Sequence, residues 1–212
     1  MRRTKEDAEK TRCAILAAAE ELFLQNGVAH TSLEQIARYA GVTRGAVYWH
    51  FQNKADLFHA LLNQVRLPPE QMASRLITAP EADPLMPLRE ICVEGVRSLA
   101  QDQKRRIFTI LLHRCEMTEE LRPAQERHQA LIEQFIELCE QQFREADRRG
   151  LLQPGVKPRQ AALALHALMV GLFSDLTRDP RGFDLSDDPG VLIDSLFRGL
   201  VINWTPSATA SV

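Results

Sequence analysis

The chain has few cysteines, and they are far apart. Its 212 residues include four, Cys13, Cys92, Cys115 and Cys139, and no two of them form a C-x-x-C pair. This pattern is typical of free thiols in a reducing compartment, so we expect neither a disulfide scaffold nor a dithiol motif. We expect the four cysteines to serve as small buried residues, and thiol sensing at Cys13 or Cys115 is the alternative.

Long apolar runs are also missing. No stretch of about 18 consecutive apolar residues predicts a transmembrane helix, and the charged N-terminus, MRRTKEDAEKTR, lacks the apolar core of a secretory signal. We therefore expect a cytoplasmic protein. The composition, 45% apolar and 25% charged, is ordinary for a globular chain that buries a sizeable core.

The sequence contains no motif of a common enzyme class: no G-x-S-x-G, no H-E-x-x-H and no phosphate-binding P-loop. His113, Cys115 and Glu116 lie close together in the sequence. However, side chains two positions apart on a helix point in different directions, so His113 and Cys115 are not expected to share a ligand or a substrate. We expect no enzyme, no metal site and no cofactor.

The net charge of −2 does not by itself indicate a nucleic-acid partner, but the charges are unevenly distributed. Residues 1–66 carry nine Lys or Arg against seven Asp or Glu, whereas residues 67–212 carry 17 against 21. The basic excess therefore lies at the N-terminal end, and a nucleic-acid partner would be bound there.

Helical periodicity runs through almost the whole chain, and no convincing strand alternation is present. We therefore predict an all-α fold. Pro68 and Pro69 indicate a domain boundary near residues 66–69, and the polar end of the chain, 205–212, is expected to be disordered. Longer helices are predicted at about 5–25, 54–65, 85–100, 103–115, 119–149, 158–178 and 189–204.

Between residues 31 and 54 the sequence predicts two short helices joined by a tight turn. Thr31 and Glu34 form a capping-box pattern, in which the Thr31 hydroxyl accepts a hydrogen bond from the Glu34 amide. Gly41 permits the positive φ that a tight turn requires. Ala37 is small enough for two helices to cross closely, and Val47 points back into their shared core. A generic helical hairpin is the alternative interpretation.

The outward face of the second short helix carries groups suited to DNA. Arg44 can donate two hydrogen bonds to a guanine edge, and Gly45 lets the backbone approach closely. For Trp49, the alternative to DNA contact is packing against a neighbouring helix. Arg2, Arg3 and Lys5 form either a DNA-contacting arm or a solvated end of the chain. The predicted DNA-contacting residues are Thr31, Ser32, Thr43, Arg44, Gly45, Tyr48, Trp49, His50 and Lys54.

A helix ending in NGV, followed by TSLEQIA, AGVTRGAVYWHF and NKADLF, resembles the DNA-binding domain of the TetR family of bacterial transcriptional repressors. The match covers about residues 8–66 and places the helix-turn-helix at 33–52. A narrower similarity, in RRTKEDAEKTR, GVTRGAVYWHF and RRIFTILLHRCEMTEEL, is to the branch that represses multidrug efflux pumps, which includes AcrR, TtgR, MtrR and MexL-like proteins.

The resemblance implies a homodimer with an N-terminal helix-turn-helix domain (1–66) and a C-terminal helical ligand-binding and dimerisation domain (67–204). Such a repressor leaves its near-palindromic operator DNA when a small hydrophobic inducer binds. A helical ligand-binding or scaffold protein without DNA affinity is the alternative. The expected ligand pocket is lined by Phe108, Leu112, His113, Cys115, Glu116 and Met169, for which core packing is the alternative. The expected dimer interface contains Leu165, Leu168, Leu172, Leu192, Leu196 and Leu200, for which the core of the monomer is the alternative.

Overall fold

The computed structural model describes residues 5–65, 83–116, 118–179 and 188–206. These residues form helices, with one isolated bridge between Leu152 and Val201, which confirms the predicted all-α fold. The chain divides into two compact units, called unit 1 (1–67 and 101–129) and unit 2 (68–100 and 130–212). The predicted arm at Arg2 and Arg3, the predicted boundary at 66–69 and the end of the predicted tail lie outside the described residues.

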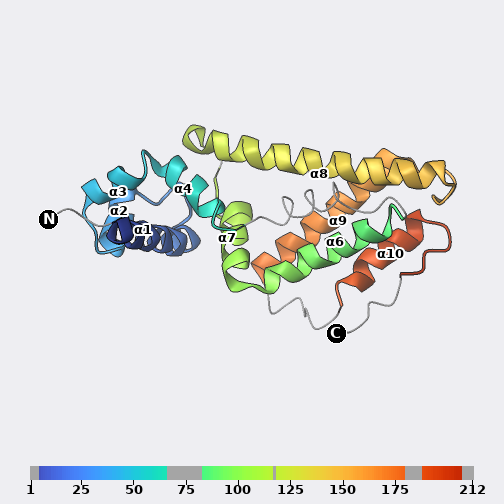
Figure 1. The fold of residues 1–212 in the computed structure, drawn as a ribbon, viewed down its shortest axis with the longest axis horizontal. Helices are drawn as coiled ribbons and strands as arrows, with labels where there is room; N and C mark the ends of the chain where they lie inside the picture. Colours follow the sequence, from blue (N-terminus) through green and yellow to red (C-terminus); the bar gives the residue numbers. More distant parts are fainter. Residues whose placement is uncertain (1–4, 66–82, 117, 180–187, 207–212) are drawn as a thin grey trace. The chain divides into compact units, whose positions relative to one another are not determined.

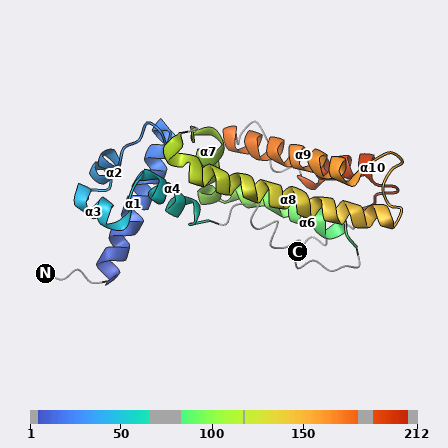
Figure 2. The ribbon, with the colours of Figure 1, turned by 90° about the horizontal axis from the view of Figure 1, so that it is seen from above.

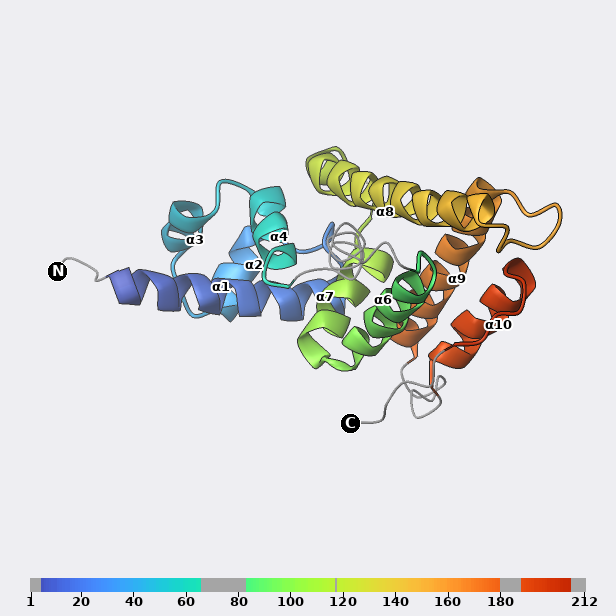
Figure 3. The ribbon, with the colours of Figure 1, turned by 45° about the vertical axis from the view of Figure 1, so that its right-hand side comes forward.

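The elements of unit 1 are α1 Lys5–Asn26, α2 Leu33–Tyr39, α3 Arg44–His50, α4 Lys54–Leu62, α7 Asp102–His113 and the short 3₁₀ helix η2 Glu119–Leu121. The first helix, α1, packs against α2, α3, α4 and α7 (Figures 1 and 3). The apolar residues of α1 recur every three or four positions, so that Ile15, Ala19, Leu22 and Phe23 are buried on one side. The Phe23 ring meets the edge of Phe58 at 6.0 Å between centroids.

The three short helices of unit 1 each begin with a side-chain cap. Ser32, Thr43 and Asn53 accept hydrogen bonds from backbone amides three residues ahead of them. Each cap satisfies one of the amides that the first turn of a helix leaves without a partner, which matters most when the helix has only two turns. The caps predicted for α3 and α4 are confirmed.

The predicted cap of α2 is wrong by one residue. Ser32, and not Thr31, is the capping residue, and its box partner is Gln35, whose side-chain oxygen accepts from the Ser32 amide at 2.7 Å. Thr31 is only 1% exposed, and its hydroxyl donates to the carbonyls of Gly27 and Leu22 at 2.8 and 3.3 Å. Both registers fit the sequence pattern, and burial of Thr31 against the end of α1 selects the second.

Unit 2 contains longer helices: α6 Met86–Arg97, continued by the 3₁₀ turn η1 Ser98–Ala100; α9 Pro158–Arg178; α10 Gly190–Leu200; and most of α8 Arg122–Arg148, which begins in unit 1. Helices α6, α9 and α10 pack on one another (Figure 2). The final helix is shorter than predicted. It ends at Leu200, and the chain then runs beside Leu151–Gln153, where the Ile202 amide donates to the Leu151 carbonyl at 2.8 Å.

Helix α9 has the length and apolar composition of a membrane-spanning helix, although it contains no unbroken apolar run of that length. However, 44% of its most apolar window is buried inside the protein. The buried residues recur at helical spacing, from Ala161 and Leu165 to Met169 and Leu172. One side of α9 therefore belongs to the core of unit 2, as in helices of globular proteins.

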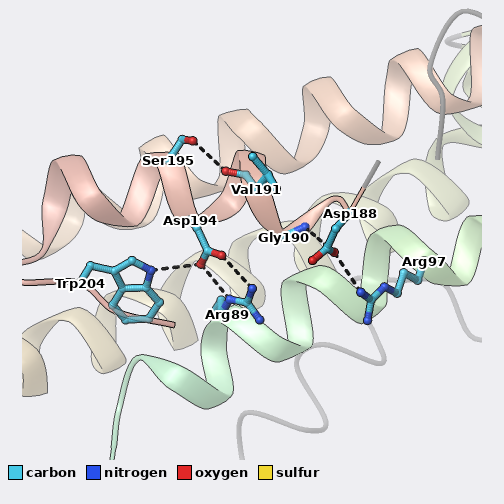
Figure 4. Close-up of polar contacts among 8 residues, drawn as sticks. All are labelled: Arg89, Arg97, Asp188, Gly190, Val191, Asp194, Ser195 and Trp204. Atoms are coloured by element: carbon cyan, nitrogen blue, oxygen red, sulfur yellow. Dashed lines mark hydrogen bonds and ion pairs between the residues drawn. The ribbon is translucent and has the colours of Figure 1, made fainter. Parts of the chain in front are cut away.

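A buried ion pair joins α6 to α10 (Figure 4). The Arg89 Nε and Nη2 atoms donate to the two carboxylate oxygens of Asp194, both at 2.8 Å, and the two residues are 5% and 4% exposed. The Trp204 indole donates to the same carboxylate at 3.0 Å and its ring stacks on Phe197. Burial alone would raise the pKa of Asp194, but the hydrogen bonds from Arg89 and Trp204 lower it below its ordinary value.

The first turn of α10 lies against this ion pair. Asp188 accepts hydrogen bonds from the Gly190 amide at 3.0 Å and from Arg97 at 2.9 Å. A methyl group at position 190 would come within 2.7 Å of Arg89 Nη2, a distance at which one of the two groups must move. Gly190 therefore leaves the space that the Arg89 guanidinium occupies.

Candidate nucleic-acid interface

Helix α3 presents one polar and aromatic face to solvent. Thr43, Arg44 and Gly45 are exposed, and Tyr48 and Trp49 are 46% and 71% exposed. The opposite face is held by Val47, which is fully buried. Neighbouring exposed aromatic rings such as these are candidates for a contact with a partner. The high exposure of Trp49 also rules out the alternative in which that ring packs against a neighbouring helix.

The crossing of α2 and α3 has the geometry expected of a helix-turn-helix. Ala37 on α2 is 4% exposed, and Val47 on α3 is 0% exposed. Gly41 lies between the helices with φ +67°, a conformation that residues with a Cβ rarely adopt. The Val42 amide donates to the Ala37 carbonyl at 3.0 Å, which closes the turn.

Contacts within the face orient its side chains before any ligand arrives. The Arg44 guanidinium lies over the Tyr48 ring at 5.4 Å, with Nη2 3.5 Å from the Tyr48 hydroxyl. This hydrogen bond raises the pKa of Arg44 and helps to keep the charge on the side chain. The Trp49 and His50 rings meet edge to face at 4.5 Å, and His50 is half-buried.

Next to this face is a concavity of about 480 Å³, lined by residues of the α1–α2 turn, α3, the start of α4 and η2. Ser32, Arg44, Tyr48 and Lys54 from the predicted DNA-contacting set line it. Thr31 also lines it, but its hydroxyl already donates to two backbone carbonyls, and Thr31 is therefore omitted from the DNA-contacting set proposed below.

Lys54 lines the concavity, and its ammonium group already has two partners. The side chain is 14% exposed, and Nζ donates to the Ala29 carbonyl at 3.1 Å and lies 3.6 Å from a carboxylate oxygen of Glu120. Sequence reasoning missed Glu120, because 66 positions separate it from Lys54 and no local pattern connects them. A second pair, at 3.1 Å, joins His30 of the α1–α2 turn to Glu116.

The residues predicted to line a ligand pocket have varied surroundings. Phe108 is 2% exposed and belongs to unit 1, whereas Met169 is 2% exposed and belongs to unit 2. Leu112 and Cys115 are half-buried, and His113 and Glu116 are exposed. None of the six lines either of the concavities described in unit 1.

The predicted dimer residues lie on two different faces. Leu165 and Leu172 are buried in the core of unit 2, so their assignment to an exposed interface is wrong; they share the inward side of α9 with Met169. Leu168, Leu196 and Leu200 are half-buried, and Leu192 is 42% exposed. The exposed apolar residues of α9, α10 and the segment after them, called the apolar face below, are Leu163, Val170, Val191, Leu192 and Ile202.

The four cysteines divide by burial. Cys92 and Cys139 are buried, Cys115 is half-buried and Cys13 is exposed. Burial raises the pKa of the Cys92, Cys115 and Cys139 thiols, which disfavours the reactive thiolate. These surroundings favour the structural role for those three.

Comparison with known proteins adds independent information. Residues 15–61 match the tetR family of bacterial regulatory proteins, and residues 83–205 match the C-terminal region of MAATS-type transcriptional repressors. The transcriptional repressor BepR of Brucella suis is 35% identical over 201 residues, which cover 94% of this chain and 96% of BepR.

Similar solved structures also belong to transcriptional repressors. The crystal structure of NalD, the secondary repressor of the MexAB-OprM multidrug efflux pump in Pseudomonas aeruginosa, is 63% identical, with a TM-score of 0.83 over 94% of this chain and all of that one. The complex of SmeT with triclosan is 33% identical, with a TM-score of 0.77 over 96% of this chain and 98% of that chain. SmeT is the repressor of the SmeDEF multidrug efflux pump of Stenotrophomonas maltophilia.

Proposed function

This chain belongs to the TetR family of DNA-binding transcriptional repressors, and we propose that within it the chain represses the genes of a multidrug efflux pump. The proposed target follows from NalD and SmeT, both of which are repressors of multidrug efflux pumps. It places the protein in the cytoplasm, where operator DNA is found. The alternative of a scaffold without DNA affinity is not favoured.

The observation that carries the proposal is the exposed face of α3. An α-helix fits the major groove, where an Arg side chain can donate two hydrogen bonds to guanine. Arg44 is exposed and oriented by Tyr48, and Gly45 beside it adds no side chain. The proposed DNA-contacting set is Ser32, Thr43, Arg44, Gly45, Tyr48, Trp49, His50 and Lys54.

The proposed active form is a homodimer that associates through the apolar face. Val191 is 58% exposed and Leu163 is 43% exposed, and burial of such side chains against a second copy is favourable. A dimer would carry two α3 helices, which suits a near-palindromic operator with half-sites about 34–36 Å apart.

A small hydrophobic ligand is the proposed inducer. SmeT has been crystallised with triclosan, and helices packed as in unit 2 commonly enclose apolar ligands. Release of the operator requires only that the ligand bind the DNA-free arrangement better than the DNA-bound one, with a coupling free energy of about 1–3 kcal/mol.

The test begins by selecting bound sequences from a random duplex library with the purified protein. We expect a near-palindrome, and Arg44→Ala should weaken binding to it by about 1–3 kcal/mol, because a bidentate base contact is lost. Arg178→Ala, which removes the same charge from an exposed position in unit 2, is the matched control. No selected sequence, or equal effects of the two variants, would contradict the proposal.

A further inference from the structure

The feature that the proposed function does not explain is the carboxylate that pairs with Lys54 inside the DNA-facing concavity. Four of the residues that line it, Ser32, Arg44, Tyr48 and Lys54, belong to the proposed DNA-contacting set. Two acidic residues, Glu34 and Glu120, line it too, and of these Glu120, whose carboxylate is 45% exposed, is the one that pairs with Lys54. A negative charge is out of place in a surface that must approach a polyanion, because it repels the phosphates.

We propose that Glu120 competes with a DNA phosphate for Lys54 and thereby limits the affinity of the protein for its operator. This inference rests on the proposed function, since it takes α3 and its surroundings as the DNA-binding face. In the DNA-free protein, Lys54 Nζ lies 3.6 Å from the Glu120 carboxylate. DNA that reaches Lys54 must therefore replace an existing charge partner.

The two contacts of Lys54 have different roles. The Ala29 carbonyl, at 3.1 Å, is a neutral acceptor that positions the ammonium group at the edge of the concavity. Glu120 supplies the opposing charge, and η2, which carries it, is a segment outside the α1–α4 group. Loss of the carboxylate would leave Lys54 in position with an unneutralised charge facing the concavity.

The neighbouring residue provides a matched control. Glu119 lies on the same 3₁₀ turn, but its carboxylate is 84% exposed and pairs with Arg122. Glu119→Gln changes the net charge by the same amount as Glu120→Gln, yet Glu119 does not line the concavity. A difference between the two variants therefore reports on position and not on overall charge.

The experiment measures binding of the full chain to a 30-base-pair duplex of random sequence over a range of salt concentrations. Phosphate contacts do not depend on sequence, so the operator need not be known. At low salt we expect Glu120→Gln to tighten binding about three- to ten-fold, with a smaller gain at high salt because exposed charges are screened. Glu119→Gln should change affinity by less than about two-fold, as isolated exposed ion pairs contribute little.

Two further variants test whether Glu120 acts through Lys54. Glu120→Asp keeps the charge and should bind DNA like the parent. In a Lys54→Gln background, the gain from Glu120→Gln should disappear, because the group under competition is absent. The salt dependence of Glu120→Gln should also be steeper by up to about 0.9 in log–log slope for each Lys54 released.

Equal affinities of Glu120→Gln and the parent, or equal gains from Glu119→Gln and Glu120→Gln, would overturn the proposal. A full gain that persists in the Lys54→Gln background would overturn it as well, because the effect would then be a general repulsion. None of these results bears on operator recognition. Failure of the proposed function would appear separately, as a parent protein that selects no sequence from the random library.

Discussion

The helices of the two units are stabilised in different ways. In unit 1, helices of seven to nine residues, α2, α3 and α4, each begin with a side-chain cap from the residue just before them. In unit 2, α6 and α9 have 12 and 21 residues and receive no side-chain cap from the residue just before them. Here the main polar contact joins Arg89 to Asp194, 105 positions away. Short helices need local partners, whereas long helices are stabilised by packing against distant segments.

The largest expected effect tests the distant contact. Arg89→Met leaves the buried Asp194 charge without its partner and should lower the free energy of unfolding by about 3–5 kcal/mol. The double variant Arg89→Met with Asp194→Leu should recover most of that loss, because a packed apolar pair replaces the ion pair. Urea unfolding followed by circular dichroism gives both values. If the double variant is as unstable as the single one, the ion pair itself stabilises unit 2.

Removal of the helix caps of unit 1 should have a smaller effect on stability. Ser32→Ala and Asn53→Ala each remove a cap and should each lower the free energy of unfolding by about 1 kcal/mol. Thr11→Ala is the control, because the exposed Thr11 hydroxyl bonds only to the Asp7 carbonyl within α1, and its loss should have little effect. Thermal unfolding of the three variants checks the ranking. If all three behave alike, the caps do not distinguish unit 1.

This difference also explains what could be predicted from the sequence. The caps Thr43 and Asn53, the turn at Gly41 and the bounds of α9 were predictable, because each depends on residues within a few positions of one another. The α2 cap was misplaced because Thr31–Glu34 and Ser32–Gln35 both fit the pattern, and only the burial of Thr31 against α1 decides between them.

Contacts between distant segments left no such signal. Nothing near Arg89 indicates Asp194, and nothing near Lys54 indicates Glu120. The same limit applies to the dimer residues. Helical spacing shows that α9 has apolar residues on more than one side, but only the packed structure places Leu165 inward and Leu163 outward.

The smallest expected effect is on the stability of the fold at low pH. The pKa of Asp194 is lower in the folded protein than the value of about 3.9 for an unfolded chain. A lowered carboxyl pKa stabilises the fold above the unfolded value, and this contribution is lost as the pH falls through the folded value. Between about pH 5 and pH 3 the parent should lose more stability than the Arg89→Met, Asp194→Leu double variant. Parallel losses in the two proteins would assign acid sensitivity to other carboxyls.

Gly190 carries a consequence for the divergence of related sequences. Its backbone needs no unusual conformation, so the restriction comes from two side chains: the Arg89 guanidinium, 2.7 Å from where a methyl group would lie, and the Asp188 carboxylate, at 3.1 and 3.2 Å. A lineage that replaces Arg89 with a shorter side chain removes the tighter of these contacts and leaves only the one with Asp188. The order of these substitutions matters, since replacement of the glycine is less costly after the arginine change than before it.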